Sequence, residues 1–215
     1  MKSILLITLL ASIISMKSFK QYLTENQQIK CDINGICKVI REYESAGNEQ
    51  KILGVYKDSK GLPTIGHGHL ITKDSARIFG EVLPEETPES IQQILSGKRK
   101  LKKEQTDKLL VRDVTARLPM VKKLAPDFEK YSPELQAELA SETFRGMAGK
   151  SPKAMGHLRA GRFEEAAKEY LNADEYRKSK AEKTGIAGRM DNFANALRKE
   201  AARRAQSQAS PQQTI

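Results

Sequence analysis

The chain has 215 residues, of which 39% are hydrophobic, and this suits one ordinary domain or two lobes that share a core. Lys and Arg number 37 against 27 Asp and Glu, which gives a net charge of +10 and favours polyanionic partners such as nucleic acid, anionic lipid or a bacterial envelope. The chain lacks zinc-finger spacing and aromatic-rich basic strands, and its densest basic run, Arg198–Arg204, is typical of a solvated helix end. These features argue against nucleic acid as the partner.

The first 15 residues are apolar after Met1 and Lys2, and they have the length of a signal-peptide core, which is short for a membrane span. No Ala-x-Ala cleavage pattern follows, so a retained signal anchor is the first alternative to a cleaved signal peptide. The second alternative is that translation begins at Met16. We expect an exported protein first, a retained signal anchor second and a translation start at Met16 third.

Cys31 and Cys37 bracket the short turn Asp32–Gly35. In an oxidising compartment they can form a disulfide, and the alternative is two reduced, half-buried cysteines. Their spacing does not match a zinc site, and we expect no metal.

An amphipathic helix is predicted around Ile36, Val39, Ile40 and Tyr43, ending before Gly47. Glu44 falls at the edge of its apolar face, and Glu42 falls almost opposite. A carboxyl at the rim of a hydrophobic surface loses hydration of its charged form, which favours the protonated acid. Glu44 is therefore the candidate general acid, with Glu42 as the fallback and an exposed helix end as the plain alternative.

Residues 54–69 predict short antiparallel strands joined by tight turns at Gly61, Gly66 and Gly68. Asp58 is expected in a turn, open to water and ionised. One protonated and one charged carboxyl is the arrangement that glycoside hydrolysis requires. The alternative for Asp58 is a turn-former that binds its own backbone.

Three runs together, Ile40–Glu44, Tyr56–Gly61 and Thr64–Leu70, resemble the phage-type lysozymes of the T-even bacteriophage endolysin family. The likeness extends over about residues 36–197. It implies an α+β, lysozyme-like fold with a small β-hairpin lobe (about 36–100), a long linking helix (about 101–118) and a helical lobe (about 120–200). The tail 201–215 is expected to be disordered.

The resemblance also implies roles for single residues. Glu44 matches the general acid, Asp58 the carboxylate that orients or activates water, and Thr64 the hydroxyl that helps to place this water, so the reaction would invert the anomeric centre without a cofactor. His69 matches a histidine that forms a structural pair with an aspartate, here Asp113.

Other positions concern the substrate cleft. Arg189 matches an arginine that faces the catalytic glutamate. Phe144 lies where the family has an asparagine-containing helix near the cleft, and the segment 45–52 is longer than the family's turn. His67 occupies a usually aliphatic position and is predicted to be an exposed strand residue, with a saccharide contact or a pH-sensitive element as the sharper alternative.

The remaining pattern predicts helices. Pro119 is expected to bend or end the linking helix, and Ser132 to cap the next one. The predicted core of the linking helix consists of Leu109, Leu110, Val114, Leu118 and Val121.

The resemblance implies an endolysin that hydrolyses the β-1,4 bond between N-acetylmuramic acid and N-acetylglucosamine in bacterial peptidoglycan and so lyses the host cell. We expect a monomer whose partners are peptidoglycan and anionic envelope polymers. It would act in the host periplasm or outside the cell, or would start in the cytoplasm and depend on a holin if translation begins at Met16. The alternatives are a lytic transglycosylase and a non-catalytic basic module that binds wall or membrane.

Overall fold

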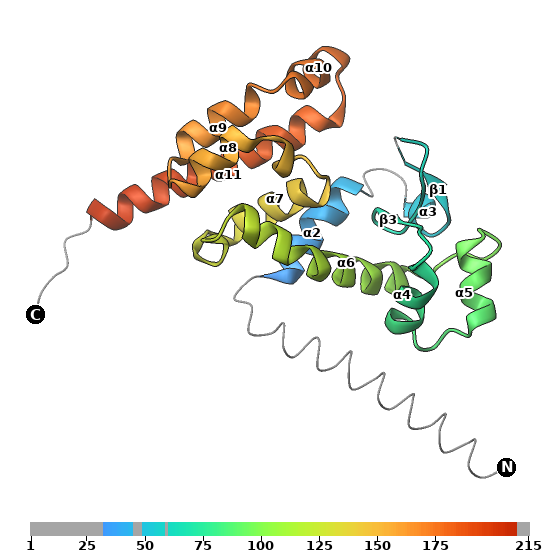
Figure 1. Cartoon of the computed structure of the whole chain (residues 1–215). Coiled ribbons are helices and arrows are strands. Elements are labelled where there is room, and N and C mark those ends of the chain that lie inside the picture. The colour runs from blue at the N-terminus through green and yellow to red at the C-terminus, as the bar shows by residue number, and fades with distance from the viewer. Residues whose placement is uncertain (1–31, 45–48, 59, 210–215) are drawn as a thin grey trace, which may run out of the picture. The chain divides into compact units, whose positions relative to one another are not determined.

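The computed structural model describes residues 32–44, 49–58 and 60–209 of the chain. The apolar N-terminal segment and Cys31 lie outside these residues, so the predictions for them stay predictions. The chain divides into two compact units that interleave along the sequence. Within the described ranges, unit 1 holds residues 44–115, and unit 2 holds residues 32–43 and 116–209. Helices in both units and one small sheet in unit 1 make the fold α+β (Figure 1).

The sheet of unit 1 is antiparallel with the strand order β1-β2-β3. Its short strands were predicted, and Gly61, Gly66 and Gly68 have the positive φ values (77°, 63° and 97°) that the turns between them require. The strands are β1 (Tyr56–Lys57), β2 (Pro63–Ile65) and β3 (His69–Leu70).

Unit 1 contains a cluster of buried apolar residues that includes Ile65, Phe79, Leu83, Ile94 and Leu109. This cluster joins the sheet to the helices, so it holds the turns of the sheet in place. The helices are α3 (Glu49–Ile52), α4 (Ser75–Val82), α5 (Pro88–Leu95) and the first part of α6 (Lys103–Leu124).

Pro119 was expected to bend or end the linking helix. Helix α6 runs through Pro119 and ends at Leu124, so Pro119 does not end it, and the bend stays a prediction. The proline ring is exposed, while Leu118 and Val121 on either side of it are buried. Burial of these neighbours outweighs the loss of one backbone hydrogen bond at the proline.

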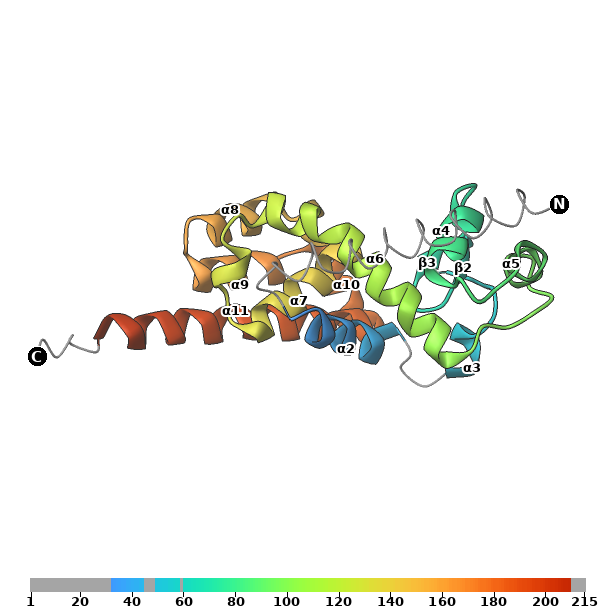
Figure 2. The same ribbon diagram turned by 90° about the horizontal axis from the view of Figure 1, so that it is seen from below.

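In unit 2, α11 lies along α9 and α7 (Figures 1 and 2). Tyr170 and Phe193 meet edge to face between α9 and α11, with ring centroids 4.8 Å apart. The side chain of Ser132 caps α7, as predicted, by accepting a hydrogen bond from the backbone N–H of Leu135. The elements are α2 (Ile33–Glu44), η1 (Phe128–Lys130), α7 (Pro133–Phe144), η2 (Ala148–Lys150), α8 (Pro152–Arg159), α9 (Phe163–Leu171), α10 (Asp174–Glu182) and α11 (Gly185–Ala209).

The prediction of disorder from residue 201 onward is wrong for residues 201–209, which continue α11. The buried carboxylate of Glu200 binds Arg203 and Arg204 one turn further on, and the Arg204 guanidinium lies 4.8 Å from the ring centroid of Phe163. These contacts stabilise the basic run as part of α11, because its arginines bind a carboxylate of the same helix and one of them packs on an aromatic ring. Residues 210–215 lie outside the described part of the chain.

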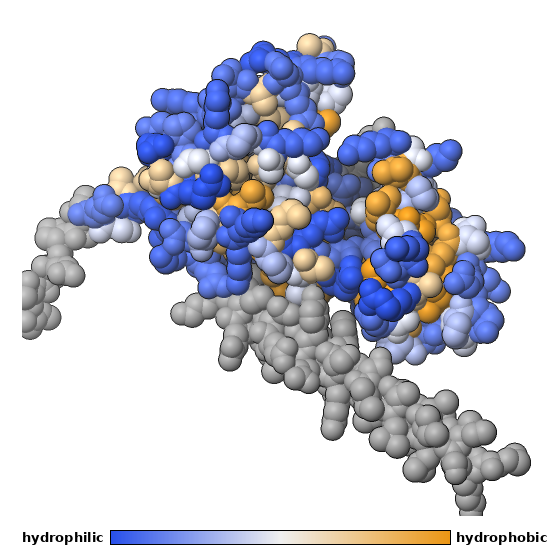
Figure 3. Space-filling model, in the orientation of Figure 1, coloured by the Kyte–Doolittle hydropathy of each residue, from blue (hydrophilic) through white to orange (hydrophobic). Residues whose placement is uncertain are grey.

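Within the described ranges, no helix is both long and apolar enough to cross a membrane. Hydrophilic residues cover most of the face of unit 2 seen in Figure 3, and hydrophobic residues gather on the visible face of unit 1. Leu62 and Leu70 in unit 1 and Met120 in unit 2 are large hydrophobic residues with exposed side chains.

Candidate active site

Glu44 is the last residue of α2 and its side chain is half-buried, whereas Glu42 is exposed. The same helix buries Ile36, Cys37 and Ile40. Glu44 therefore lies at the border between the apolar face and solvent, where the sequence pattern places it. The general-acid role needs a partly desolvated carboxyl, and Glu44 meets this condition better than Glu42.

Tyr56, which the sequence analysis did not single out, interacts with all three predicted catalytic residues. Its Cα partner across β1 and β2 is Thr64, so the two side chains lie on the same face of the sheet. Burial raises the pKa of Tyr56 to about 12, and the negative charges of Glu44 and, to a smaller degree, Asp58 contribute to this rise, against a backbone hydrogen bond from Gly68 that lowers it. Both carboxyls therefore act electrostatically on the phenol.

The phenol itself is fixed in place. Its hydroxyl donates a hydrogen bond to the carbonyl of Gly66 at 3.1 Å, and the Lys51 ammonium lies 4.7 Å from the ring centroid. The two contacts orient the Tyr56 ring.

Asp58 builds the turn between β1 and β2. Its Oδ1 accepts hydrogen bonds from the backbone N–H groups of Lys60 and Leu62, each at 2.8 Å, and its side chain is half-buried rather than fully open to water. This is the turn-forming arrangement that was the alternative for this residue. One carboxylate oxygen is therefore already occupied by the backbone.

Thr64 is also tied to this turn. Its side chain is 3% exposed, and its hydroxyl donates a hydrogen bond to the carbonyl of Leu62 at 3.1 Å. Glu44, Asp58 and Thr64 are together in unit 1, but Asp58 and Thr64 both have structural contacts. Their roles in placing water stay predictions.

The two histidines lie on the buried side of the sheet region. The structure brings the expected pair together, with His69 Nδ1 2.7 Å from Asp113 Oδ2. The prediction that His67 is an exposed strand residue is wrong, because His67 is 4% exposed and lies in the turn between β2 and β3, with Nε2 3.8 Å from Asp107 Oδ1. The left-handed backbone of Gly66 on one side and Gly68 on the other turns this side chain inward.

Two predicted cleft residues lie in unit 2. The Arg189 guanidinium donates a hydrogen bond to the carbonyl of Tyr43 and lies 4.8 Å from its ring centroid. Phe144 is half-buried at the end of α7, with the Arg117 guanidinium 4.3 Å from its ring centroid. Their expected relation to Glu44 and to substrate stays a prediction. The predicted disulfide stays a prediction as well, since Cys37 is buried on α2 and Cys31 lies outside the described residues.

Sequence reasoning missed a row of carboxyls on α7. Glu134, Glu138 and Glu142 recur every fourth residue and so share one face of the helix. Burial raises the pKa of Glu138 to about 7, the charges of Glu142, Glu134 and Glu42 add to this rise, and the hydrogen bond from Tyr43 opposes it. The four-residue spacing could have been seen in the sequence, but the burial of Glu138 and Glu142 could not.

Glu142 is fully buried and lies in a charged network. Its Oε2 is 2.9 Å from an Arg145 guanidinium nitrogen and accepts a hydrogen bond from the Tyr170 hydroxyl, and the same guanidinium lies 3.3 Å from Glu175 Oε1. Burial, with a further contribution from the charge of Glu142, raises the pKa of Tyr170. The network ties α7 to α9 and α10.

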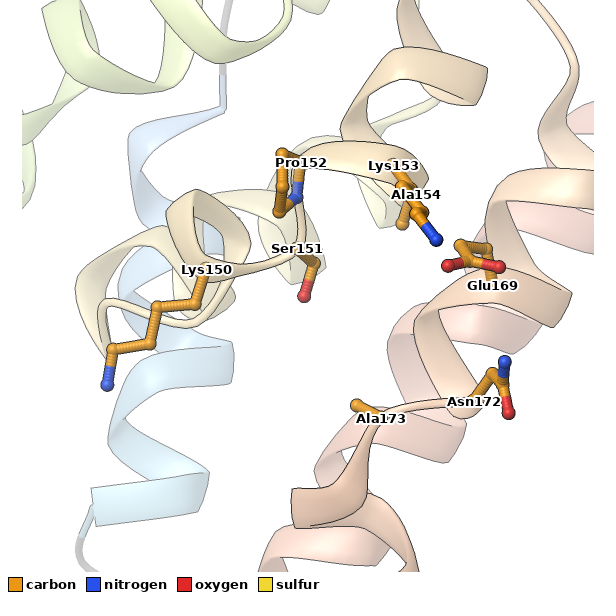
Figure 4. Close-up of a pocket in the computed structure, with 8 residues that line it drawn as sticks. All are labelled: Lys150, Ser151, Pro152, Lys153, Ala154, Glu169, Asn172 and Ala173. Carbon is orange, nitrogen blue, oxygen red and sulfur yellow. The ribbon is translucent and has the colours of Figure 1, made fainter.

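A separate pocket lies between η2, α8 and α9 and is lined by residues that include Lys150, Ser151, Lys153, Glu169 and Asn172 (Figure 4). The side chains of Lys153 and Glu169 point toward one another across it. None of the predicted site residues lines this pocket. In the part of the chain that the structure describes, no three His, Cys, Asp or Glu side chains come together to hold a metal ion.

No family model matches the chain, and no curated protein matches its sequence.

Proposed function

We propose that the protein is an endolysin of the lysozyme type, which hydrolyses the β-1,4 bond between N-acetylmuramic acid and N-acetylglucosamine in peptidoglycan. The observation that carries this proposal is that Thr64 pairs with Tyr56 across the sheet, while the charges of Glu44 and Asp58 both act on the Tyr56 phenol. It supplies two carboxyls in different surroundings, one at a helix end and one in a hydrogen-bonded turn, beside a hydroxyl.

In the proposed reaction, Glu44 donates a proton to the oxygen that leaves when the glycosidic bond breaks. Asp58, whose Oδ1 accepts the backbone N–H groups of Lys60 and Leu62, polarises a water on the opposite face of the sugar ring with its carboxylate. This water attacks the anomeric carbon, gives a proton to the Asp58 carboxylate and inverts the configuration of the carbon. The net charge of +10 would concentrate the enzyme on the anionic envelope.

A lytic transglycosylase is the second candidate, and the hydrogen bonds of the turn favour it. Asp58 Oδ1 and the Thr64 hydroxyl are both occupied by the backbone, which leaves fewer groups to place a water. In this reaction a single glutamate protonates the leaving oxygen, and the sugar's own C6 hydroxyl attacks C1, losing its proton to the same residue. The product is an anhydro sugar.

Product analysis separates these functions. The protein from Met16 onward, Glu44→Gln and the matched control Glu42→Gln would each be incubated with isolated peptidoglycan, and the released ends identified by mass spectrometry. Reducing muramic acid ends that disappear in Glu44→Gln and persist in Glu42→Gln support the lysozyme. Anhydro ends support the transglycosylase. Release that persists in Glu44→Gln rules out Glu44 as the acid in either reaction, and an absence of release by the wild type favours a non-catalytic basic module.

A further inference from the structure

The residue before Glu44 is held at its backbone by α11. Because α2 ends at Glu44, the carbonyl of Tyr43 belongs to the last turn, whose carbonyls have no partner within the helix. The Arg189 guanidinium donates a hydrogen bond to this carbonyl. A cation at this end of a helix also complements the helix dipole. Arg189 therefore stabilises the last turn of α2.

The side chain of Tyr43 is held by two further helices. Asn192 Nδ2 on α11 donates a hydrogen bond to the Tyr43 hydroxyl at 2.7 Å, and the hydroxyl lies 3.0 and 3.1 Å from the two carboxyl oxygens of Glu138 on α7. A hydroxyl has one proton, and the amide nitrogen can only donate, so the proton of Tyr43 is directed to Glu138. Hydrogen bonds thus run from α11 through α2 to α7.

Glu138 is an unusual residue for this position, because it is 8% exposed. The negative charges of Glu134 and Glu142 on its own helix and of Glu42 on α2 act on it and disfavour its charged form. An apolar side chain would avoid the cost of burying a carboxyl here. A buried group that breaks this local rule is expected where it serves a function.

We propose that Glu138, Asn192 and Arg189 form a clamp on Tyr43, the α2 clamp, and that this clamp fixes the last turn of α2 and so positions Glu44. Glu138 is a positioning residue, since it acts on Glu44 through Tyr43. Glu44 follows Tyr43 in the same helix, so a displacement of one displaces the other. This inference rests on the proposed function of Glu44 as the acid.

The test compares four variants in the full-length protein. Tyr43→Phe removes only the hydroxyl and keeps the ring beside Arg189, and Glu138→Ala removes the acceptor. Glu138→Gln keeps an oxygen acceptor for Tyr43 without the charge. Glu134→Ala, one turn earlier and exposed, is the matched control. For each variant, backbone hydrogen exchange in residues 40–44 and kcat and KM on soluble wall fragments would be measured, after a thermal transition shows that it is folded.

We expect Tyr43→Phe and Glu138→Ala to speed exchange in the last turn of α2 by about fivefold, the effect of losing one hydrogen bond. Misplacement of the acid should lower kcat by about tenfold or more and leave KM within about twofold. Glu138→Gln should restore kcat to within about threefold of the wild type, and Glu134→Ala should match the wild type. A merely structural role would not produce this split between kcat and KM.

Two results would overturn the clamp. One is exchange in residues 40–44 that is no faster in Tyr43→Phe and Glu138→Ala than in the wild type. The other is an unchanged kcat in both variants while Glu44→Gln is inactive. An active Glu44→Gln is a different result, since it overturns the proposed function and, with it, the positioning role of Glu138.

Discussion

His69 and Asp113 form a buried pair, with Nδ1 of the imidazole 2.7 Å from Oδ2 of the carboxylate. The pair joins β3 to α6. Arg112 donates a hydrogen bond to the second carboxylate oxygen at 2.9 Å, and the imidazole ring packs edge-on against Phe79, with centroids 5.6 Å apart. The pair thus anchors the sheet to α6. Thr64 and Tyr56 lie on the face of the sheet opposite to His69.

We therefore expect Asp113→Ala to lower the free energy of unfolding by about 3–5 kcal/mol, because the change leaves buried donors without their acceptor. Urea unfolding of the purified protein would measure this change. The control is Glu81→Ala, which removes the exposed ion pair with Arg77 and should cost less than about 1 kcal/mol. A loss of similar size in both variants would contradict a structural role for the pair.

Much of the fold could be predicted because its patterns are local. The apolar spacing of Ile36 and Ile40 predicted α2, the serine before Pro133 predicted the start of α7, and the glycines around His67 predicted the turns of the sheet. The continuation of α6 through Pro119 could not be predicted in this way, because it depends on tertiary burial of the residues beside the proline.

The candidate site was predicted only in part, for a related reason. Spacing placed Glu44 at the rim of an apolar face, but it could not show that Asp58 would bind its own turn. Nor could it show that Tyr43 and Glu138, far apart in sequence, would meet through a hydrogen bond. Helical periodicity predicts which side of a helix faces the core, but it does not predict which polar groups meet there.

Glu138 should make stability fall as the pH rises. Its pKa is raised from 4.5 to about 7 by burial and by the carboxylates of Glu142, Glu134 and Glu42, so between these values the folded protein binds a proton that the unfolded chain has lost. Stability from the protonated carboxyl is complete below the unfolded pKa and is lost as the pH rises through the folded pKa.

Glu138→Gln removes this titration. Between about pH 4.5 and pH 8, the wild type should lose about 1–3 kcal/mol more stability than the variant. Unfolding curves of both proteins across this range would measure the difference. Parallel stability profiles would show that Glu138 does not bind a proton more tightly in the folded state.

Glu200 should have the opposite effect. Although burial acts against the charged form, the guanidinium groups of Arg203 and Arg204 and the backbone N–H of Ser132 lower its pKa to about 2. The stability from this carboxylate is present above the unfolded pKa of 4.5 and is lost as the pH falls through about 2.

Glu200→Gln should therefore cost about 1–3 kcal/mol at neutral pH, and this cost should shrink during acid titration. Circular dichroism during unfolding at several pH values would follow it. Glu165→Gln, an exposed position on α9, is the control and should stay near the wild type. A cost that is the same at acid and neutral pH would point to lost packing instead of lost charge.

Pro119→Ala should stabilise the protein. Pro119 is exposed in the interior of α6, so alanine leaves no cavity and supplies the N–H that proline lacks. We expect a gain of about 1–3 kcal/mol in the free energy of unfolding, measured with urea. Met120→Ala, at the next exposed position, should change it by less than about 0.5 kcal/mol. A destabilised Pro119→Ala would mean that the packing of α6 depends on the proline.

Asp58 offers a test that separates its two roles. Asp58→Asn removes the charge but keeps an oxygen that can accept the hydrogen bonds from Lys60 and Leu62, whereas Asp58→Ala removes both. If Asp58 directs water, both variants should lose about 100-fold or more in wall hydrolysis, and only Asp58→Ala should lose about 1 kcal/mol of stability. The contrary result is cleavage that survives in Asp58→Asn and falls only in Asp58→Ala. In that case Asp58 only stabilises the turn, and Glu44 is the one ionisable group in the reaction, as the transglycosylase alternative requires.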